Sequence, residues 1–211
     1  MKTNILLRKL RMEGKEFVTS AELKRYCGSM NLNYEIAIRH FISRGYLVRI
    51  FRGVFYVKSL DEIELGKIRY SHLELVAKGM ELKNVENWYF GLYTALKLNN
   101  VTHEHFAADY VVNDRIFRAK PVNIAGYKFK FVKLAPALLE FGLTVKNRLR
   151  YSNIEKTILD FIYVWRYNGI PRNKIVLDAE DWANNISKAK IIKYSKNYPK
   201  TVREIVRELA G

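Results

Sequence analysis

Hydrophobic positions near the start of the chain recur first at helical spacing and then at strand spacing. The pattern predicts short helices over residues 4–12, 20–27 and 34–44, the first of them stopped at Gly14. Two β-rich runs, "YLVRI" and "VFYV", follow at once and are joined by the tight connection "FRG". This order of three helices and a two-stranded hairpin is typical of a winged helix-turn-helix, in which the third helix enters the major groove of DNA.

Local residue choices support the second and third of these helices. Thr19 is followed three residues later by Glu22, which is a capping-box pattern, and Asn33 stands where it can cap the third helix. By helical spacing the third helix has one buried stripe, formed by Ala37, Ile38, Phe41 and Ile42. The polar residues of that helix therefore face away from the expected core.

The middle of the chain mixes helical and strand spacing. A helix is expected from about Trp88 to Asn99, whereas "KIRYSHLELVAKGM" fits a strand or a helix equally well. "FAADYVVND" and "IFRAKPVNIAGYKFKFVKL" contain alternating or β-branched runs, with a turn at Ala125 and Gly126. These runs predict an antiparallel or mixed sheet.

The end of the chain is predicted to be mostly helical. "SNIEKTILDFIYVWRYNG" places its apolar residues on one face, with Ser152 as a cap and Gly169 at its end. Further helices are expected in "LDAEDWANNIS" and in "PKTVREIVRELAG", where Thr201 and Glu204 have capping-box spacing.

The predicted elements amount to an α+β protein with two domains. Residues 1–58 form the winged helix-turn-helix, and the acidic stretch 59–66 is a linker or a capping turn that leads into the next element. Residues 67–211 form a larger mixed α/β domain with a helical C-terminal tail.

Charge narrows the class of partner. Lysine and arginine total 37 against 21 aspartate and glutamate, which gives a formal net charge of +16. Residues 1–58 hold 12 basic and 4 acidic residues, a net of +8, while the remaining 153 residues hold 25 and 17, also a net of +8. The charge density is therefore more than twice as high in the first domain, which favours binding of DNA there.

Compartment and membrane association follow from other patterns. Charges interrupt the N-terminal apolar residues, and apolar runs stay well short of the ~18 residues that a membrane span requires. Cys27 is the single cysteine, so no disulfide framework or zinc-finger spacing is present. We expect a cytoplasmic protein that has no membrane partner.

Candidate contacts with double-stranded DNA lie on the second and third helices and on the hairpin. They are Thr19, Ser20, Asn33, Tyr34, Arg39, His40, Arg49 and Arg52. Arginine reads guanine through two hydrogen bonds and asparagine can read adenine, whereas hairpin arginines reach the minor groove or the phosphates. An ordinary solvated helix face, and helix capping by Thr19, are the simpler explanations of the same residues.

Other polar groups give weaker indications of chemistry. His103 and His105 would share one face of a strand near Asp109, but a further ligand of suitable spacing is lacking, so we predict no metal site and no cofactor. Glu155 and Asp160 are five residues apart on a helix and point in different directions, which favours structural roles. We predict no catalytic residues. The lysine-rich tail "SKAKIIKYSKNYPK" is either a solvated face or a further contact with DNA or RNA.

Two ordered motifs resemble a known family. The chain resembles the AbiEi-type antitoxins of type IV toxin–antitoxin systems over roughly residues 5–170. The hairpin motif of that family is matched by Arg52, Gly53, Phe55 and Tyr56, and its later helix signature by Glu155, Thr157, Leu159 and Asp160. Lys156 stands where the family usually has arginine.

The resemblance implies a transcriptional repressor that regulates its own operon by binding an inverted-repeat operator. It also implies an antitoxin that counters a partner nucleotidyltransferase toxin without necessarily forming a stable complex with it. Two alternatives stay open from the residues alone. One is a winged helix joined to a nuclease-like or nucleotide-modifying enzyme domain, and the other is an RNA-binding module.

Overall fold

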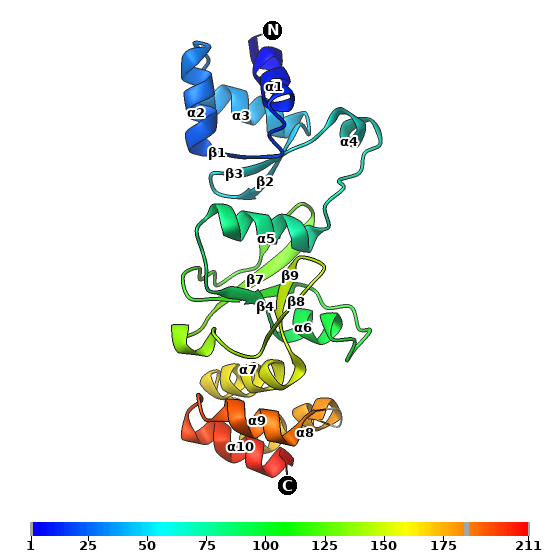
Figure 1. The fold of residues 1–211 in the computed structure, drawn as a ribbon, viewed down its shortest axis with the longest axis vertical. Helices are drawn as coiled ribbons and strands as arrows, with labels where there is room; N and C mark the ends of the chain where they lie inside the picture. The colour runs from blue at the N-terminus through cyan, green and yellow to red at the C-terminus, as the bar shows by residue number, and fades with distance from the viewer. Residues whose placement is uncertain (1, 184–185, 211) are drawn as a thin grey trace. The chain divides into compact units, whose positions relative to one another are not determined.

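The computed structural model describes residues 2–183 and 186–210, and the chain divides into two compact units (Figure 1). The first unit comprises Met1–Glu86 and Asn123–Tyr127, and the second comprises Asn87–Val122 and Lys128–Gly211. Helices and sheets occur in one chain, which confirms the α+β class. Within the described residues, no helix combines the length and the apolar character needed to cross a membrane.

Helices and a three-stranded antiparallel sheet build the first unit. Its elements are α1 (Lys2–Met12), β1 (Phe17–Thr19), α2 (Ser20–Ser29), α3 (Tyr34–Ser43), β2 (Leu47–Phe51), β3 (Val54–Val57), α4 (Leu60–Glu64) and α5 (His72–Leu82). The strand order is β1-β3-β2, so Phe55 of β3 lies between Val18 and Arg49. The predicted helices and hairpin are confirmed, and β1 is an addition to them.

Side-chain caps fix where α2 and α3 begin. Thr19 Oγ1 accepts a hydrogen bond from the Glu22 N–H at 3.3 Å, and the Glu22 carboxylate accepts one from the Thr19 N–H at 2.9 Å. Asn33 Oδ1 accepts a hydrogen bond from the Ile36 N–H at 3.1 Å. The predicted capping box and the predicted N-cap are both confirmed, because each satisfies N–H groups that a helix start leaves unpaired.

A buried cluster holds α1, α2 and α3 together with the sheet. Its members without exposed surface are Leu6, Leu10, Val18, Leu23 and Phe41. Ala37, Ile38 and Phe41 of the predicted stripe are buried, and Ile42 is half-buried beside them. Helix α3 is thereby held by one face, which leaves the other face exposed.

The segment after the hairpin is helical. Ser59 and Glu62 form a capping box at the start of α4, so the stretch 59–66 contains a short helix of its own. The ambiguous segment "KIRYSHLELVAKGM" contains α5, whose N-cap is Ser71. Because α4 and α5 belong to the first compact unit, that unit extends beyond the domain predicted at 1–58.

Helix α5 packs closely against the hairpin strand β2. A Cβ atom added at Gly79 would lie 2.7 Å from Ile50 Cγ2 and 2.6 Å from Phe51 Cε2. Glycine is therefore required at this position of α5, since a larger residue would push the helix away from β2.

The second unit combines a mixed sheet with helices. The remaining elements of the chain are β4 (Trp88–Phe90), α6 (Leu92–Leu98), β5 (Asp109–Asn113), β6 (Val122–Ile124), β7 (Tyr127–Lys133), the 3-10 helix Pro136–Leu138, β8 (Leu143–Lys146), β9 (Leu149–Ser152), α7 (Ile154–Tyr167), α8 (Arg172–Ala183), α9 (Lys188–Ser195) and α10 (Lys200–Ala210). All of them belong to the second unit except β6 and the first residue of β7, which overlap the segment Asn123–Tyr127 of the first unit. The strand order is β6-β7-β5-β4-β9-β8, with β4 parallel to β9 and antiparallel to β5. The sheet is thus mixed.

The helix predicted from Trp88 to Asn99 is wrong in its first part. Trp88–Phe90 form the buried strand β4 between β5 and β9, and α6 begins only after Gly91. Aromatic residues favour strands, and pairing on both edges outweighs the helical spacing of the apolar residues.

Two predicted caps are also wrong. Asn153, rather than Ser152, caps α7, because Ser152 ends strand β9 and its buried hydroxyl lies 2.7 Å from Thr157 Oγ1. Thr201 lies inside α10 rather than at its N-cap. Gly169 follows α7 with a φ of +78°, as the predicted helix end requires.

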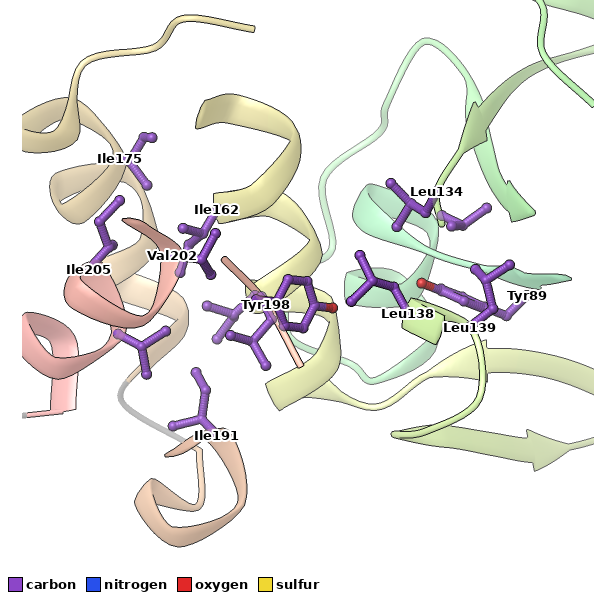
Figure 2. Packing of buried hydrophobic residues seen from close by; sticks show 14 residues of the cluster. Tyr89, Leu134, Leu138, Leu139, Ile162, Ile175, Ile191, Tyr198, Val202 and Ile205 are labelled. Carbon is purple, nitrogen blue, oxygen red and sulfur yellow. The ribbon is translucent and has the colours of Figure 1, made fainter. Parts of the chain in front are cut away.

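A second core joins the C-terminal helices to α7 and to one face of the sheet. Figure 2 shows Ile162 of α7 beside Val202 of α10, with Ile175 and Ile191 nearby. The hydroxyl ends of Tyr89 and Tyr198 point toward one another across this core (Figure 2). Burial of such side chains stabilises the unit by roughly 1.5–3 kcal/mol each.

Candidate nucleic-acid interface

Helix α3 presents a mixed polar and apolar face to solvent. Glu35 and Arg39 are exposed, Ile36 is 64% exposed, and His40 is half-buried. Ile36, Arg39 and His40 share one side of the helix by their spacing of three and four residues. This side offers a guanidinium that suits guanine and an aliphatic group that suits the methyl of thymine.

Hydrogen bonds join the starts of α2 and α3 to the turn of the hairpin. The Tyr34 hydroxyl donates to Ser20 Oγ at 3.0 Å, and the Ser20 N–H donates to the Gly53 carbonyl oxygen at 2.9 Å. Gly53 has a φ of +81°, and an added Cβ would lie 2.9 Å from Ser20 Oγ. The turn that carries Arg52 is therefore seated against the start of α2.

The two hairpin arginines are both exposed but occupy different parts of the hairpin. Arg49 is exposed within β2, and its guanidinium is 5.6 Å from the centre of the Phe55 ring, a cation–π contact. Arg52 lies in the turn between β2 and β3, with its neighbour Gly53 in a left-handed conformation. Both positive charges therefore lie on the hairpin surface, and Arg52 lies at its tip.

Further cations are exposed on α2 and directly after α3. Lys24 and Arg25 on α2 and Arg44 after α3 are exposed, and Lys24 Nζ lies 5.4 Å from the centre of the Tyr34 ring. Glu35 is the exposed carboxylate on α3. The balance is strongly positive, which attracts a phosphate backbone.

The capping carboxylate Glu22 is used for folding. Burial acts to raise the pKa of Glu22, but hydrogen bonds from the Thr19 N–H and from Lys15 outweigh burial and lower it. The Thr19 hydroxyl and Asn33 Oδ1 likewise serve the caps. Helix capping therefore explains why Thr19 and Asn33 stand at these positions, and no bound ligand is needed to explain the Thr19 hydroxyl or Asn33 Oδ1.

Sequence reasoning missed Ile36, Lys24 and Arg25 as members of this surface. Ile36 could have been found, because it is an apolar residue outside the predicted buried stripe of its helix. Lys24 could not, because its position beside Tyr34 depends on how α2 packs against α3, and Arg25 was not singled out although its exposure on α2 is a local feature.

A second polar cluster lies inside the second unit. Lys156 and Asp160 of α7 are 0% exposed, and Lys156 Nζ donates to Asp160 Oδ1 at 2.5 Å, to the Tyr89 hydroxyl at 2.8 Å and to the Tyr198 hydroxyl at 2.7 Å. Both tyrosine hydroxyls also donate to the Asp160 carboxylate, each at 2.7 Å. Burial lowers the pKa of Lys156, and Asp160 opposes that shift.

This cluster fits a structural role. The Glu155 carboxylate accepts a hydrogen bond from the Ser187 N–H at 3.1 Å, whereas the Asp160 carboxylate bonds Lys156, Tyr89 and Tyr198, as expected for carboxylates that point in different directions. Asp160 accepts hydrogen bonds from the hydroxyls of Tyr89 and Tyr198, which lie far from it in the sequence. The cluster ties β4, α7 and the segment before α10 together.

The remaining candidates are dispersed on the surface. His103 and His105 are exposed in a loop, not on a strand, and Asp109 accepts a hydrogen bond from Thr94 Oγ1 at 3.0 Å. Among the residues that the structure describes, no three histidine, cysteine, aspartate or glutamate side chains are placed to hold a metal ion. The exposed lysines of the tail are Lys188, Lys190, Lys193, Lys196 and Lys200.

Comparison with known proteins defines the fold. No protein-family model and no curated protein matches the chain. Among solved structures, the crystal structure of the RV2827C protein from Mycobacterium tuberculosis is similar, with a TM-score of 0.61 at 13% sequence identity. The match covers 99% of this chain and 76% of that one, so the α+β fold recurs at low sequence identity.

Proposed function

We propose that residues 1–58 form a winged helix-turn-helix that binds double-stranded DNA in a sequence-specific manner. In this proposal α3 is the recognition helix, and the β2–β3 hairpin is the wing beside it. Arg39 and Ile36 contact base edges, while Arg49 and Arg52 contact the phosphates or the minor groove.

One observation carries the proposal. The exposed face of α3 and the arginine-bearing turn are joined to a common point, the start of α2, by the hydrogen bonds of Ser20. A rigid connection of this kind lets a helix and a wing contact neighbouring parts of one duplex. The excess of 12 basic over 4 acidic residues in the same 58 positions supports a polyanionic partner.

The test is a gel shift with the promoter region upstream of the gene, against random duplex and structured RNA. We expect the promoter duplex to be bound preferentially. Arg39→Ala should weaken promoter binding by about 1–3 kcal/mol and relax specificity at one base position. Arg8 is an exposed arginine of α1. Arg8→Ala is the matched control and should leave the affinity for the promoter and the base specificity unchanged. Equal binding of all three nucleic acids would refute the proposal.

We further propose that the protein represses its own operon and acts as an antitoxin rather than as an enzyme. The support for this part is the resemblance of the hairpin and α7 motifs to the AbiEi-type antitoxins, together with the structural use of Lys156 and Asp160 in α7. The second unit then counters a partner nucleotidyltransferase toxin. Co-expression with a nucleotidyltransferase encoded beside the gene should relieve growth arrest, and persistence of the arrest would contradict this role.

A further inference from the structure

A cavity of about 490 Å³ opens on the second unit. None of its lining residues belongs to the proposed DNA-binding surface. Its walls come from β5, β7, the loop after β5 and the C-terminal end of α7. A volume of this size lies within the usual range of small-molecule sites.

Aromatic side chains form much of the wall. Phe117 is 62% exposed and Tyr167 is 85% exposed, although large aromatic side chains are normally buried in a core. Tyr110 and Tyr163 line the same cavity and are half-buried. Exposed rings beside a cavity offer flat faces on which another planar group can stack.

The charged residues of the cavity all carry positive charge. Arg118, Lys130 and Lys133 line it, and its described lining residues include no carboxylate. Lys130 Nζ lies 5.8 Å from the centre of the Tyr110 ring, so cation and aromatic face are adjacent. A ligand that suits this cavity has a planar aromatic group and a negative charge.

We propose that this cavity binds a nucleotide whose base is unpaired. Tyr167 and Phe117 stack on the base, and Arg118, Lys130 and Lys133 neutralise its phosphate, the combination by which proteins hold single-stranded nucleic acid. The nucleotide is either a free mononucleotide or one unit of a single strand. The site shares no residue with the proposed duplex-binding surface, and the proposal does not depend on that surface.

Fluorescence anisotropy of a labelled single-stranded oligonucleotide of about ten nucleotides tests the site on the full-length protein. The parent should bind the strand, and Tyr167→Ala should weaken binding about fivefold or more, because base stacking is lost. Tyr167→Phe should bind as the parent does. Tyr127→Ala, which removes another exposed aromatic ring, and Lys97→Ala, which removes an exposed lysine of α6, are the matched controls.

The same measurement separates the second site from the first. In a protein that already carries Arg52→Ala, Tyr167→Ala should weaken strand binding by the same factor as in the parent. Tyr167→Ala should leave binding of the promoter duplex unchanged. If the promoter duplex is not bound while the Tyr167 effect persists, the proposed function fails and this site stands.

Competition and direct titration distinguish the two sources of the nucleotide. Adenosine 5′-monophosphate, uridine 5′-monophosphate, uridine and inorganic phosphate are added to the labelled complex, and the two mononucleotides are also titrated directly by NMR. Displacement by a mononucleotide, or direct binding without strand binding, indicates a free nucleotide. Strand binding without displacement indicates a strand. Either result supports the site. The proposal is overturned if neither strand nor mononucleotide binds, if inorganic phosphate alone competes equally well, or if Tyr167→Ala binds like the parent.

Discussion

Removing one partner of the buried Lys156–Asp160 pair should strongly destabilise the second unit. Both side chains are 0% exposed, and the Lys156 ammonium donates hydrogen bonds to Asp160, Tyr89 and Tyr198 and lies 5.1 Å from the centre of the Phe141 ring. Asp160→Leu therefore leaves a buried ammonium that faces tyrosine hydroxyls and the Phe141 ring but has lost its carboxylate partner. Loss of one partner of such a pair costs about 3–5 kcal/mol, a large fraction of the roughly 5–15 kcal/mol that stabilises a typical domain.

The double variant Lys156→Met/Asp160→Leu should recover part of that loss, because both charges are gone and similar apolar volume replaces them. Recovery should be incomplete, because the buried hydroxyls of Tyr89 and Tyr198 lose their partners. Each unsatisfied hydroxyl costs about 1–3 kcal/mol of stability. The loss of the double variant should therefore be smaller than the sum of the two single losses, with a coupling of about 0.5–3 kcal/mol, the range for contacting residues.

Urea unfolding followed by tryptophan fluorescence measures these differences. Trp88, Trp165 and Trp182 are the three tryptophans of the chain and all lie in the second unit, so the signal reports on that unit. Lys97→Met, at an exposed position of α6, is the matched control and should change stability little. A loss below about 1 kcal/mol for Asp160→Leu, or strictly additive losses in the double variant, would refute the reasoning.

Two further changes test the first unit. Gly53→Ala should weaken binding of the promoter duplex, because Gly53 has a φ of +81° and an added Cβ would lie 2.9 Å from Ser20 Oγ. Gly45→Ala, with a φ of +72° but open space around its Cβ, should weaken binding less in the same gel shift, and equal effects would contradict the role of the turn. Burial acts to raise the pKa of Glu62, but hydrogen bonds, beginning with that from the Arg69 N–H, lower it below 4.5. Its stabilising contribution is thus present above pH 4.5 and is lost as the pH falls through the folded-state pKa. Glu62→Gln should make the stability of the first unit less sensitive to acid, as measured by urea titrations followed by NMR signals of that unit. If the pH dependence of stability is unchanged, the Glu62 carboxylate does not make this contribution.

Local chemistry explains why the first unit was predictable. The capping box at Thr19 and the cap at Asn33 act within one helical turn, so four adjacent residues suffice to place each helix start. The exposed position of Arg39 follows from the helical period alone. The hydrogen bond between Tyr34 and Ser20 spans 14 residues, and no local pattern indicates it.

Long-range packing explains what the sequence did not reveal in the second unit. Trp88–Phe90 become a strand because β5 and β9 pair with them, and both strands come later in the chain. The spacing of Lys156 and Asp160 is visible in the sequence, but their partners Tyr89 and Tyr198 are 67 and 42 residues away from Lys156. Fold class was accessible from the spacing of apolar residues, whereas the buried cluster required the structure.

The most direct test of duplex binding by α3 and the hairpin is the salt dependence of affinity for the promoter duplex. The proposal predicts sequence-specific binding at physiological salt, with log affinity falling linearly as log salt concentration rises. Arg52→Ala should reduce the magnitude of that slope by about one, the loss of one phosphate contact, while Arg8→Ala should leave it unchanged. Absence of specific binding at physiological salt, or an Arg52→Ala protein with unchanged affinity and slope, would contradict it.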